Sequence, residues 1–314
     1  IQTINLEYNQ YVRDISRFEL FNEKIKEAID NMPALIFSNT IQDKFNSKQT
    51  AVLCISDAHN GVEINMQTVF NEPINIYSPD ILKKRLNKLA DTVIKDYKNN
   101  FNYKKLIVFD LGDGIQNILR LSDIAKLKTG VIDSVLQYAE MISQFLNKIQ
   151  NELNIQIEFS CLGGNHSELR LISTGRNWES ENLGKVIREF IALRLKDNQN
   201  IKVDPYSDFS FKQIEGINIL AIHGDDSKKN INEISYWEQY HNITIDILLM
   251  GHFHHQEQIS LGYSPTGDKE IIIVPSLIGI DEFSRKNRKL ARAGAKFILF
   301  EDNNKTWEKV IYLN

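Results

Sequence analysis

Polar residues of metal-binding type follow short apolar runs along this chain. One run, Leu106–Asp113, has an apolar, β-branched body that predicts a strand buried on both faces, and it ends in Gly112 and Asp113. Four other runs end in similar residues, namely Asp57 and His59, Asn165 and His166, His223, and His252 and His254. Open α/β sheets bind ligands outside the carboxyl ends of their strands, so these side chains are candidates for one shared site.

The residue types at these strand ends suit a site for two divalent metal ions. Such a site needs a carboxylate shared between ions roughly 3.5–4 Å apart, together with neutral imidazoles, so that a bound hydroxide attacks phosphorus in line. Asp113 is the candidate for the shared carboxylate. Five of the seven histidines lie in these runs, which chance placement explains poorly. Nitrogen and oxygen ligands without thiolate favour Mn²⁺ as the cofactor, with Fe or Zn as alternatives.

Taken in order, these motifs resemble the signature of the calcineurin-like metallophosphoesterase superfamily, which is D-x-H, G-D, G-N-H, H and G-H-x-H. The matched span covers roughly residues 51–255. The resemblance implies that the first metal ion is held by Asp57, His59, Asp113 and His254. It implies that the second is held by Asp113, Asn165, His223 and His252. His166 would contact the phosphate and act as the general acid for the leaving oxygen, a role that an imidazole suits.

Details of the motifs favour one branch of that superfamily. Residues 114–117 do not match the Asp-Arg-Gly of its protein phosphatases, and Gly163 stands where they place Arg. The G-N-H motif keeps its histidine at position 166, and in this respect the chain resembles the double-strand-break repair nucleases. The segment Pro275–Phe283 resembles phage- and prophage-type members. The resemblance therefore implies a phosphodiesterase or nuclease acting on nucleic acid. A small or cyclic nucleotide phosphodiesterase and a phosphomonoesterase remain alternatives, and an inactive metal-binding docking subunit is the alternative from another class.

Several basic residues are candidate phosphate contacts, because guanidinium groups match phosphate in a bidentate manner. They are Arg120, Arg170 and Arg176, and the positive patch that contains Arg285, Lys286 and Arg288. If the loop that carries this patch folds over the metal ions, it would follow a nucleic-acid backbone. The alternative interpretation is that these are ordinary surface residues or a solvated helix face.

Composition narrows the class of protein. With 314 residues and 42% hydrophobic content the chain can bury a large core, and its net charge of −4 argues against nonspecific coating of nucleic acid. Cys54 and Cys161 lie in apolar runs and are expected to be buried, reduced thiols. No apolar stretch approaches the roughly 20 residues that span a bilayer. A cytoplasmic protein without a membrane partner is expected, and a homodimer is left open.

The order of elements predicts an α/β protein. Residues 1–50 are interpreted as a helical extension packed on the core, and residues 51–314 as the metallophosphoesterase domain. Helical periodicity is expected over residues 81–97, 131–149 and 183–195, between strands of a mainly parallel first half. The second half contains several strands joined by Gly-containing turns. Two stacked sheets with helices outside are predicted, and the resemblance implies a four-layer α/β/β/α sandwich.

Overall fold

The computed structural model describes residues 19–20, 23–37, 47–117, 126–168, 182–264 and 267–314 of the chain. Its first sheet has six strands in the order β13-β12-β1-β4-β5-β6. The four strands from the first two thirds of the chain run parallel to one another, β12 runs antiparallel to its neighbour β1, and β13 runs antiparallel to β12. These strands are β1 (Thr50–Ile55), β4 (Lys105–Asp110), β5 (Gln156–Cys161), β6 (Ile201–Val203), β12 (Gly294–Glu301) and β13 (Asn304–Tyr312).

A second sheet has five strands in the order β10-β11-β9-β8-β7, with β8, β9 and β11 parallel and antiparallel strands at both edges. They are β7 (Phe209–Ile214), β8 (Ile217–Ile222), β9 (Ile247–Met250), β10 (Glu257–Ser264) and β11 (Gly267–Ile273). A separate two-stranded ribbon is formed by β2 (Ile64–Gln67) and β3 (Pro73–Tyr77). The sequence pattern does not predict this ribbon, because Pro73 and the short alternation make the segment resemble a loop.

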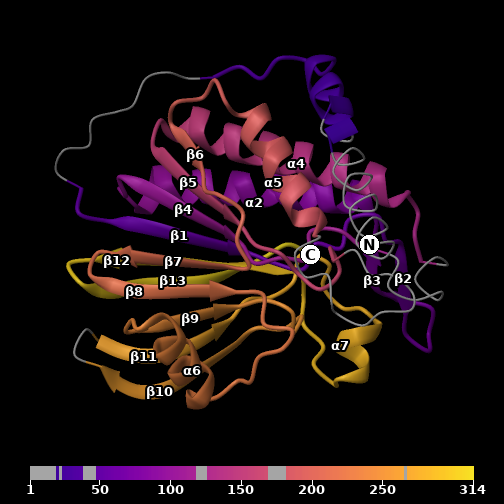
Figure 1. The fold of residues 1–314 in the computed structure, drawn as a ribbon. Helices are drawn as coiled ribbons and strands as arrows, with labels where there is room; N and C mark the ends of the chain where they lie inside the picture. The colour runs from indigo at the N-terminus through magenta and orange to yellow at the C-terminus, as the bar shows by residue number, and fades with distance from the viewer. Residues whose placement is uncertain (1–18, 21–22, 38–46, 118–125, 169–181, 265–266) are drawn as a thin grey trace, which may run out of the picture.

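The two sheets stack face to face, and helices cover their outer faces (Figure 1). Strand β1 illustrates the cause, since its alternate side chains point to opposite faces. Val52 and Cys54 join the apolar layer between the sheets, whereas Leu53 joins the layer under the helices. Helices α2 (Pro79–Asn100), α4 (Val131–Leu153) and α5 (Leu183–Arg194) cover the first sheet, and α6 (Ile231–His241) covers the second. The predicted α/β fold class, with mixed sheets and helices, is confirmed.

The helices begin where their sequences predict. Ser78 caps α2 by accepting the N–H of Ile81, with Pro79 in the first turn, and Asn182 caps α5 by accepting the N–H of Gly184. The three helices expected from periodicity are present with boundaries extended or shortened by a few residues. Helix α6 and the short α7 (Glu282–Lys286) were not predicted. No helix among the described residues has the length and apolar character required to cross a membrane.

Part of the N-terminal segment packs on the main core. Residues 23–30 are helical, and Ile25 is buried in the apolar layer under the helices. The carbonyl of Ile36 accepts hydrogen bonds from Asn147 and Asn151 of α4. Three apolar residues that precede Ile25 at helical spacing, Ile15, Phe18 and Phe21, lie outside the described residues. The division of the chain at residue 50 stays a prediction.

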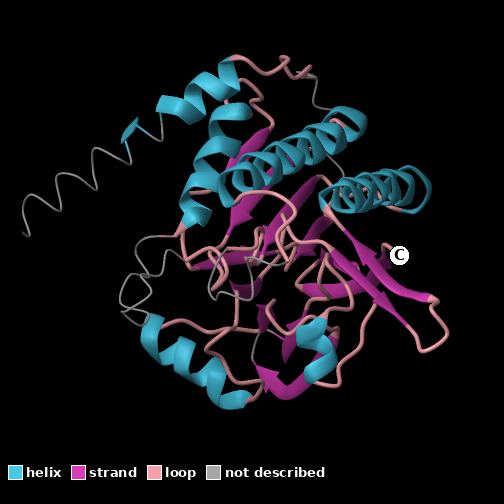
Figure 2. Cartoon of the chain, turned by 90° about the vertical axis from the view of Figure 1, so that its right-hand side faces the viewer, coloured by secondary structure: helices cyan, strands magenta, loops and turns pink. Residues whose placement is uncertain are grey.

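The carboxyl ends of β1, β4, β5, β8 and β9 meet at one edge of the sandwich, which faces the viewer in Figure 2. Backbone hydrogen bonds join the loops that leave these strands. The amide of Asp57 donates to the carbonyl of Gly112, and the amide of Gly251 donates to the carbonyl of His223. Residues from five separated segments are therefore held against one another at this edge.

Candidate metal centre

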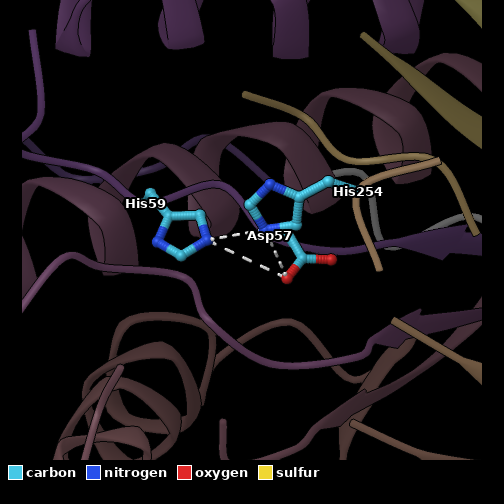
Figure 3. A group of neighbouring side chains, drawn as sticks. All are labelled: Asp57, His59 and His254. Carbon is cyan, nitrogen blue, oxygen red and sulfur yellow. Dashed lines mark hydrogen bonds and ion pairs between the residues drawn. The ribbon is translucent and has the colours of Figure 1, made fainter. Parts of the chain in front are cut away.

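Asp57, His59 and His254 form a first cluster where β1 and β9 end (Figure 3). The Nε2 atoms of the two histidines lie 3.2 Å apart, and Oδ1 of Asp57 lies 3.3 Å from Nε2 of His254 and 3.9 Å from Nε2 of His59. An ion with ligand distances of roughly 2.0–2.2 Å would separate neighbouring ligand atoms by roughly 3.0–3.5 Å. The cluster therefore has nearly the spacing of a transition-metal site.

The two carboxylate oxygens of Asp57 have different surroundings. Oδ2 accepts hydrogen bonds from the Ser56 hydroxyl and, at 2.9 Å, from the backbone N–H of His252. Oδ1 is buried, faces the two imidazoles and has no hydrogen-bond partner among the described residues. A buried carboxylate oxygen is costly unless a donor or a cation satisfies it. The residues of the first cluster thus fit a metal ion.

Asp113, Asn165, His223 and His252 form a second cluster beside the first. Nε2 of His223 lies 3.1 Å from Oδ2 of Asp113 and 3.1 Å from Oδ1 of Asn165. Asp113, His223 and His252 each offer a ligand atom within 4.8 Å of the others. All of these donors are nitrogen or oxygen atoms, which suit divalent transition metals. The structure brings together every residue that the sequence proposed for this cluster.

Asp113 lies between the two clusters. It belongs to one group of ligand atoms with His59 and His166 and to another with His223 and His252, each within 4.8 Å. Its side chain is buried, and its Oδ1 also accepts the backbone N–H of His166 at 2.7 Å. This is the position that a carboxylate shared by two metal ions requires.

Three of the clustered histidines have an oxygen atom close to Nδ1. Oε1 of Gln116 at 3.0 Å is a hydrogen-bond partner of His59, the carbonyl of Leu111 at 2.8 Å is one of His223, and Oδ2 of Asp281 forms an ion pair with His254 at 3.1 Å. Such a partner holds a proton on Nδ1 and leaves the Nε2 lone pair facing the cluster, as in protein metal sites. Gln116 and Asp281 were not predicted as site residues, and the only sequence signal for them is their position close to the motifs.

The backbone is left-handed at many of these residues. The φ angles are 52° at Asp57, 44° at His59, 53° at Asp113, 64° at His252 and 54° at His254. This conformation costs a non-glycine residue roughly 1–2 kcal/mol, so the surrounding contacts must hold it in place. The turn at each strand end is therefore organised to direct these side chains toward one another, at the expense of local stability.

Two glycines of the motifs allow close approach. A Cβ atom at Gly164 would lie 2.2 Å from Oδ1 of Asp113, and one at Gly251 would lie 2.1 Å from the hydroxyl of Ser56, which binds Asp57. Both distances are below any real carbon contact, and both neighbours are buried. Glycine is required at these positions because the loops pack directly on the ligand carboxylates.

In each cluster a carboxylate faces an imidazole, and each group shifts the pKa of the other. Burial would lower the pKa of His223 and His254, but Asp113 and Asp57 respectively outweigh it and raise both pKa values to about 10. Burial would likewise raise the pKa of Asp57, but His254 lowers it to about 2. Without metal, these two imidazoles are therefore protonated at neutral pH. A divalent ion would take the place of those protons.

His166 lies beside the first cluster, with its ring centroid 4.7 Å from that of His59. Burial lowers the pKa of His166 to about 3, against the opposing effect of Asp113. Its Nδ1 is buried without a hydrogen-bond partner among the described residues. The ring is therefore neutral at pH 7 and retains one N–H that can donate to a phosphoryl oxygen. Its role as general acid stays a prediction and requires a bound phosphate to raise this pKa.

The predicted phosphate contacts divide into two groups. Arg120, Arg170 and Arg176 lie outside the described residues. Arg285 and Lys286 on α7 and Arg288 just after it are exposed. Helix α7 is beside the metal centre, because its N-cap residue Asp281 contacts His254. The loop that carries this basic patch therefore does approach the clusters, and its contact with a phosphate stays a prediction.

No family model matches the chain. A protein of Bacillus subtilis (strain 168) described as SPbeta prophage-derived uncharacterized protein YonJ is 29% identical over 306 residues, which cover 96% of this chain and 73% of that protein. Among solved structures, a predicted phosphoesterase from Streptococcus pneumoniae TIGR4 is 11% identical and covers 85% of this chain and 99% of its own, with a TM-score of 0.34. Yfce, a phosphoesterase from E. coli, is 12% identical over 84% of this chain and 100% of its own, with a TM-score of 0.35. Zinc-bound Vps29 from Entamoeba histolytica is 11% identical over 84% and 99%, with a TM-score of 0.36.

Proposed function

We propose that this chain is a metal-dependent phosphoesterase that binds two divalent ions. The observation that carries the proposal is the place of Asp113, whose buried carboxylate lies between the two clusters. The first ion would be held by Asp57, His59, Asp113 and His254, and the second by Asp113, Asn165, His223 and His252. Mn²⁺ is the ion we propose for both sites, because the donors are imidazole, carboxylate and amide groups.

When bound, the ions would supply an activated water and neutralise charge on the phosphoryl group. The residues of the protein hold the ligand side chains in the required orientation. The oxygens at Nδ1 of His59, His223 and His254 hold these rings with Nε2 toward the ions. His166, held by its backbone bond to Asp113, would donate its ring N–H to a phosphoryl oxygen.

We propose a phosphodiester of nucleic acid as the substrate class. The exposed cations Arg285, Lys286 and Arg288 next to the metal centre support this choice, since they would bind the phosphates that flank the cleaved one. The prophage-derived relative from Bacillus subtilis agrees with a phage-type member of the superfamily. A phosphomonoesterase remains the alternative and differs in the substrate that it prefers.

The replacement Asp113→Asn tests the metal assignment. It keeps the side-chain volume but weakens the shared ligand, so Mn²⁺ bound per chain should fall and the hydrolysis of bis(p-nitrophenyl) phosphate should drop by more than about 100-fold. The matched control is Asp110→Asn. Asp110 is also buried at the end of β4, but it accepts a hydrogen bond from Tyr138, and burial raises its pKa to about 7, so a neutral amide should be tolerated there.

Two outcomes would contradict the metal-dependent phosphoesterase assignment, and a third would change the proposed substrate class. Full activity in Asp113→Asn would exclude a shared metal ligand at that position. Metal binding by the wild-type protein without turnover of any phosphoester would favour the inactive docking subunit. A preference for p-nitrophenyl phosphate over bis(p-nitrophenyl) phosphate would replace the diester assignment with a monoester one.

A further inference from the structure

Phe283 is an exposed aromatic residue at the metal centre. Its ring centroid lies 5.0 Å from that of His254 and 5.4 Å from that of His252, and both contacts are edge to face. The residue nevertheless keeps 38% of its surface exposed. One part of the ring therefore contacts two of the proposed metal ligands, and another part is open to solvent. An aromatic surface in that position is available to a bound substrate.

The position of this ring is tied to the ligands. Asp281 caps α7 in a reciprocal capping box with Ser284, whose side chain is buried, and Asp281 also lies 3.1 Å from Nδ1 of His254. Phe283 lies between the two residues of that box in the sequence. The capping contacts of Asp281 and Ser284 therefore hold the backbone on both sides of Phe283, and the ring lies against His252 and His254 beside the metal centre.

The charges around Phe283 favour a polyanion. Glu282, its acidic neighbour, lies 2.9 Å from the ammonium group of Lys126, which offsets its charge. Arg285, Lys286 and Arg288 are exposed, and none of them forms an ion pair within the part of the chain that the structure describes. An exposed aromatic ring followed within two turns by cations combines a stacking surface with phosphate-binding groups.

We propose that Phe283 stacks against an unpaired nucleobase adjacent to the phosphate that is cleaved, while Arg285 and Lys286 bind the next phosphate of the strand. This inference rests on the proposed phosphodiesterase function and specifies its substrate as single-stranded nucleic acid or a frayed end. Stacking on aromatic rings tolerates every base, because each base has a π face. Bases inside a duplex are already stacked and would not reach the ring.

Two diesters with the same leaving group test the platform. Thymidine 5′-p-nitrophenyl phosphate carries a base, and methyl p-nitrophenyl phosphate does not. For Phe283→Ala with Mn²⁺, kcat/KM should fall roughly 5- to 150-fold on the thymidine diester, the range that the loss of one stacked base corresponds to, and should change less than about twofold on the methyl diester. Phe283→Trp should restore the thymidine diester activity. Tyr263→Ala, which removes an exposed aromatic from β10, is the matched control and should affect neither substrate.

Equal losses on both diesters would overturn the inference, because Phe283 would then only support His252 and His254. Unchanged kinetics on the thymidine diester would overturn it as well. A second measurement is independent of turnover, namely binding of a fluorescein-labelled ten-residue oligothymidylate in EDTA, followed by anisotropy. Phe283→Ala should weaken this binding by a similar factor, and an unchanged affinity would exclude the platform.

The same assay separates this inference from the proposed function. If the wild-type protein hydrolyses neither diester but binds the oligothymidylate in a Phe283-dependent manner, the phosphodiesterase assignment fails and the stacking platform stands. The double variant Arg285→Gln with Lys286→Gln should weaken oligothymidylate binding and reduce its dependence on salt. Lys84→Gln with Lys95→Gln, an equal change of charge on exposed positions of α2, should not. Equal binding of a blunt duplex, with the same sensitivity to Phe283→Ala, would contradict a site for unpaired bases.

Discussion

Oδ2 of Asp281 lies 3.1 Å from Nδ1 of His254, although the two residues belong to different loops of the chain. Asp281 is also the residue that caps α7, so one carboxylate orients a proposed metal ligand and starts the helix that carries Phe283. Burial would raise the pKa of Asp281, but the hydrogen bond and charge of His254 lower it well below its usual range. The carboxylate is therefore ionised when it faces the ring. This pairing couples the metal centre to the adjacent surface.

Replacing Asp281 with Asn should weaken metal binding. The amide removes the charge that holds the His254 ring with Nε2 toward the first cluster, and partners of this kind are worth roughly 10- to 100-fold in metal affinity. Titration calorimetry with Mn²⁺ measures the change. Glu282→Gln is the matched control, because Glu282 is the next residue but pairs with Lys126. Equal affinities for Asp281→Asn and the wild-type protein would show that the contact does not orient the ring.

Replacing Arg85 with Met should destabilise the protein and the site together. Arg85 is buried and donates hydrogen bonds to the carbonyls of Leu277 and Ile278 at 2.7 and 2.8 Å, and to Asn75 at 2.9 Å. Its loss removes the side-chain donor of the buried Leu277 carbonyl and leaves Ile278 with Asn75 alone, which should cost about 1–3 kcal/mol of unfolding free energy. Urea unfolding measures the cost, with the exposed Lys84→Met on the same helix as control. A loss no larger than that of the control would contradict a supporting role.

Metal binding should release protons. The pKa values of His223 and His254, raised to about 10 by the facing carboxylates against the effect of burial, keep both rings protonated without metal at pH 7 to 8. Because Mn²⁺ binds neutral imidazole, close to two protons should leave per chain, and the affinity should rise with pH by about tenfold per unit for each proton released. Calorimetry in buffers of different ionisation enthalpy counts these protons. Binding without proton release would contradict the assigned ligands.

Acid should destabilise the junction between the sheets. Glu158 on β5 pairs with Lys105 on β4 and, at 2.9 Å, with Lys212 on β7 of the second sheet. Burial would raise the pKa of Glu158, but these hydrogen bonds lower it to about 2. Because the pKa of Glu158 is lower in the folded state than in the unfolded chain, where it is roughly 4.3, the ionised carboxylate stabilises the fold above pH 4.3. This stabilisation is lost as the pH falls toward 2.

The variant Glu158→Gln should therefore lose about 1–3 kcal/mol of unfolding free energy at neutral pH, a range reduced because the side chain is partly exposed. Between pH 4.5 and 2, its unfolding free energy should fall less steeply than that of the wild-type protein. Unfolding in urea at a series of pH values measures both effects. Glu72→Gln, an exposed carboxylate in the turn between β2 and β3, serves as control. Parallel pH profiles for Glu158→Gln and the wild-type protein would contradict the assignment.

Local pattern predicted most of the elements that build the site. Strands β8 and β9 form where apolar runs end in His223 and in His252 and His254, because a strand buried along most of its length has a nearly continuous apolar sequence. The expectation that Cys54 and Cys161 are buried free thiols is also confirmed. The ribbon β2–β3 was missed, since its strands are short and half of their residues face solvent. The periodicity of α6 is weak, and only Ile234 is buried among its residues.

The sequence by itself determined which residues stand at the strand ends, because a buried strand and the residue that ends it are both local features. Only the tertiary structure decided which partners complete the site. Gln116, Asp281 and Phe283 contact the histidines across separate loops, and such contacts leave no periodic trace in the sequence. The C-terminal hairpin β12–β13 likewise joins the first sheet beside β1 rather than the sheet formed by the strands that precede it. Pairing between strands that are far apart in the sequence depends on which apolar faces must still be buried in the whole fold. A short window of sequence does not contain this information.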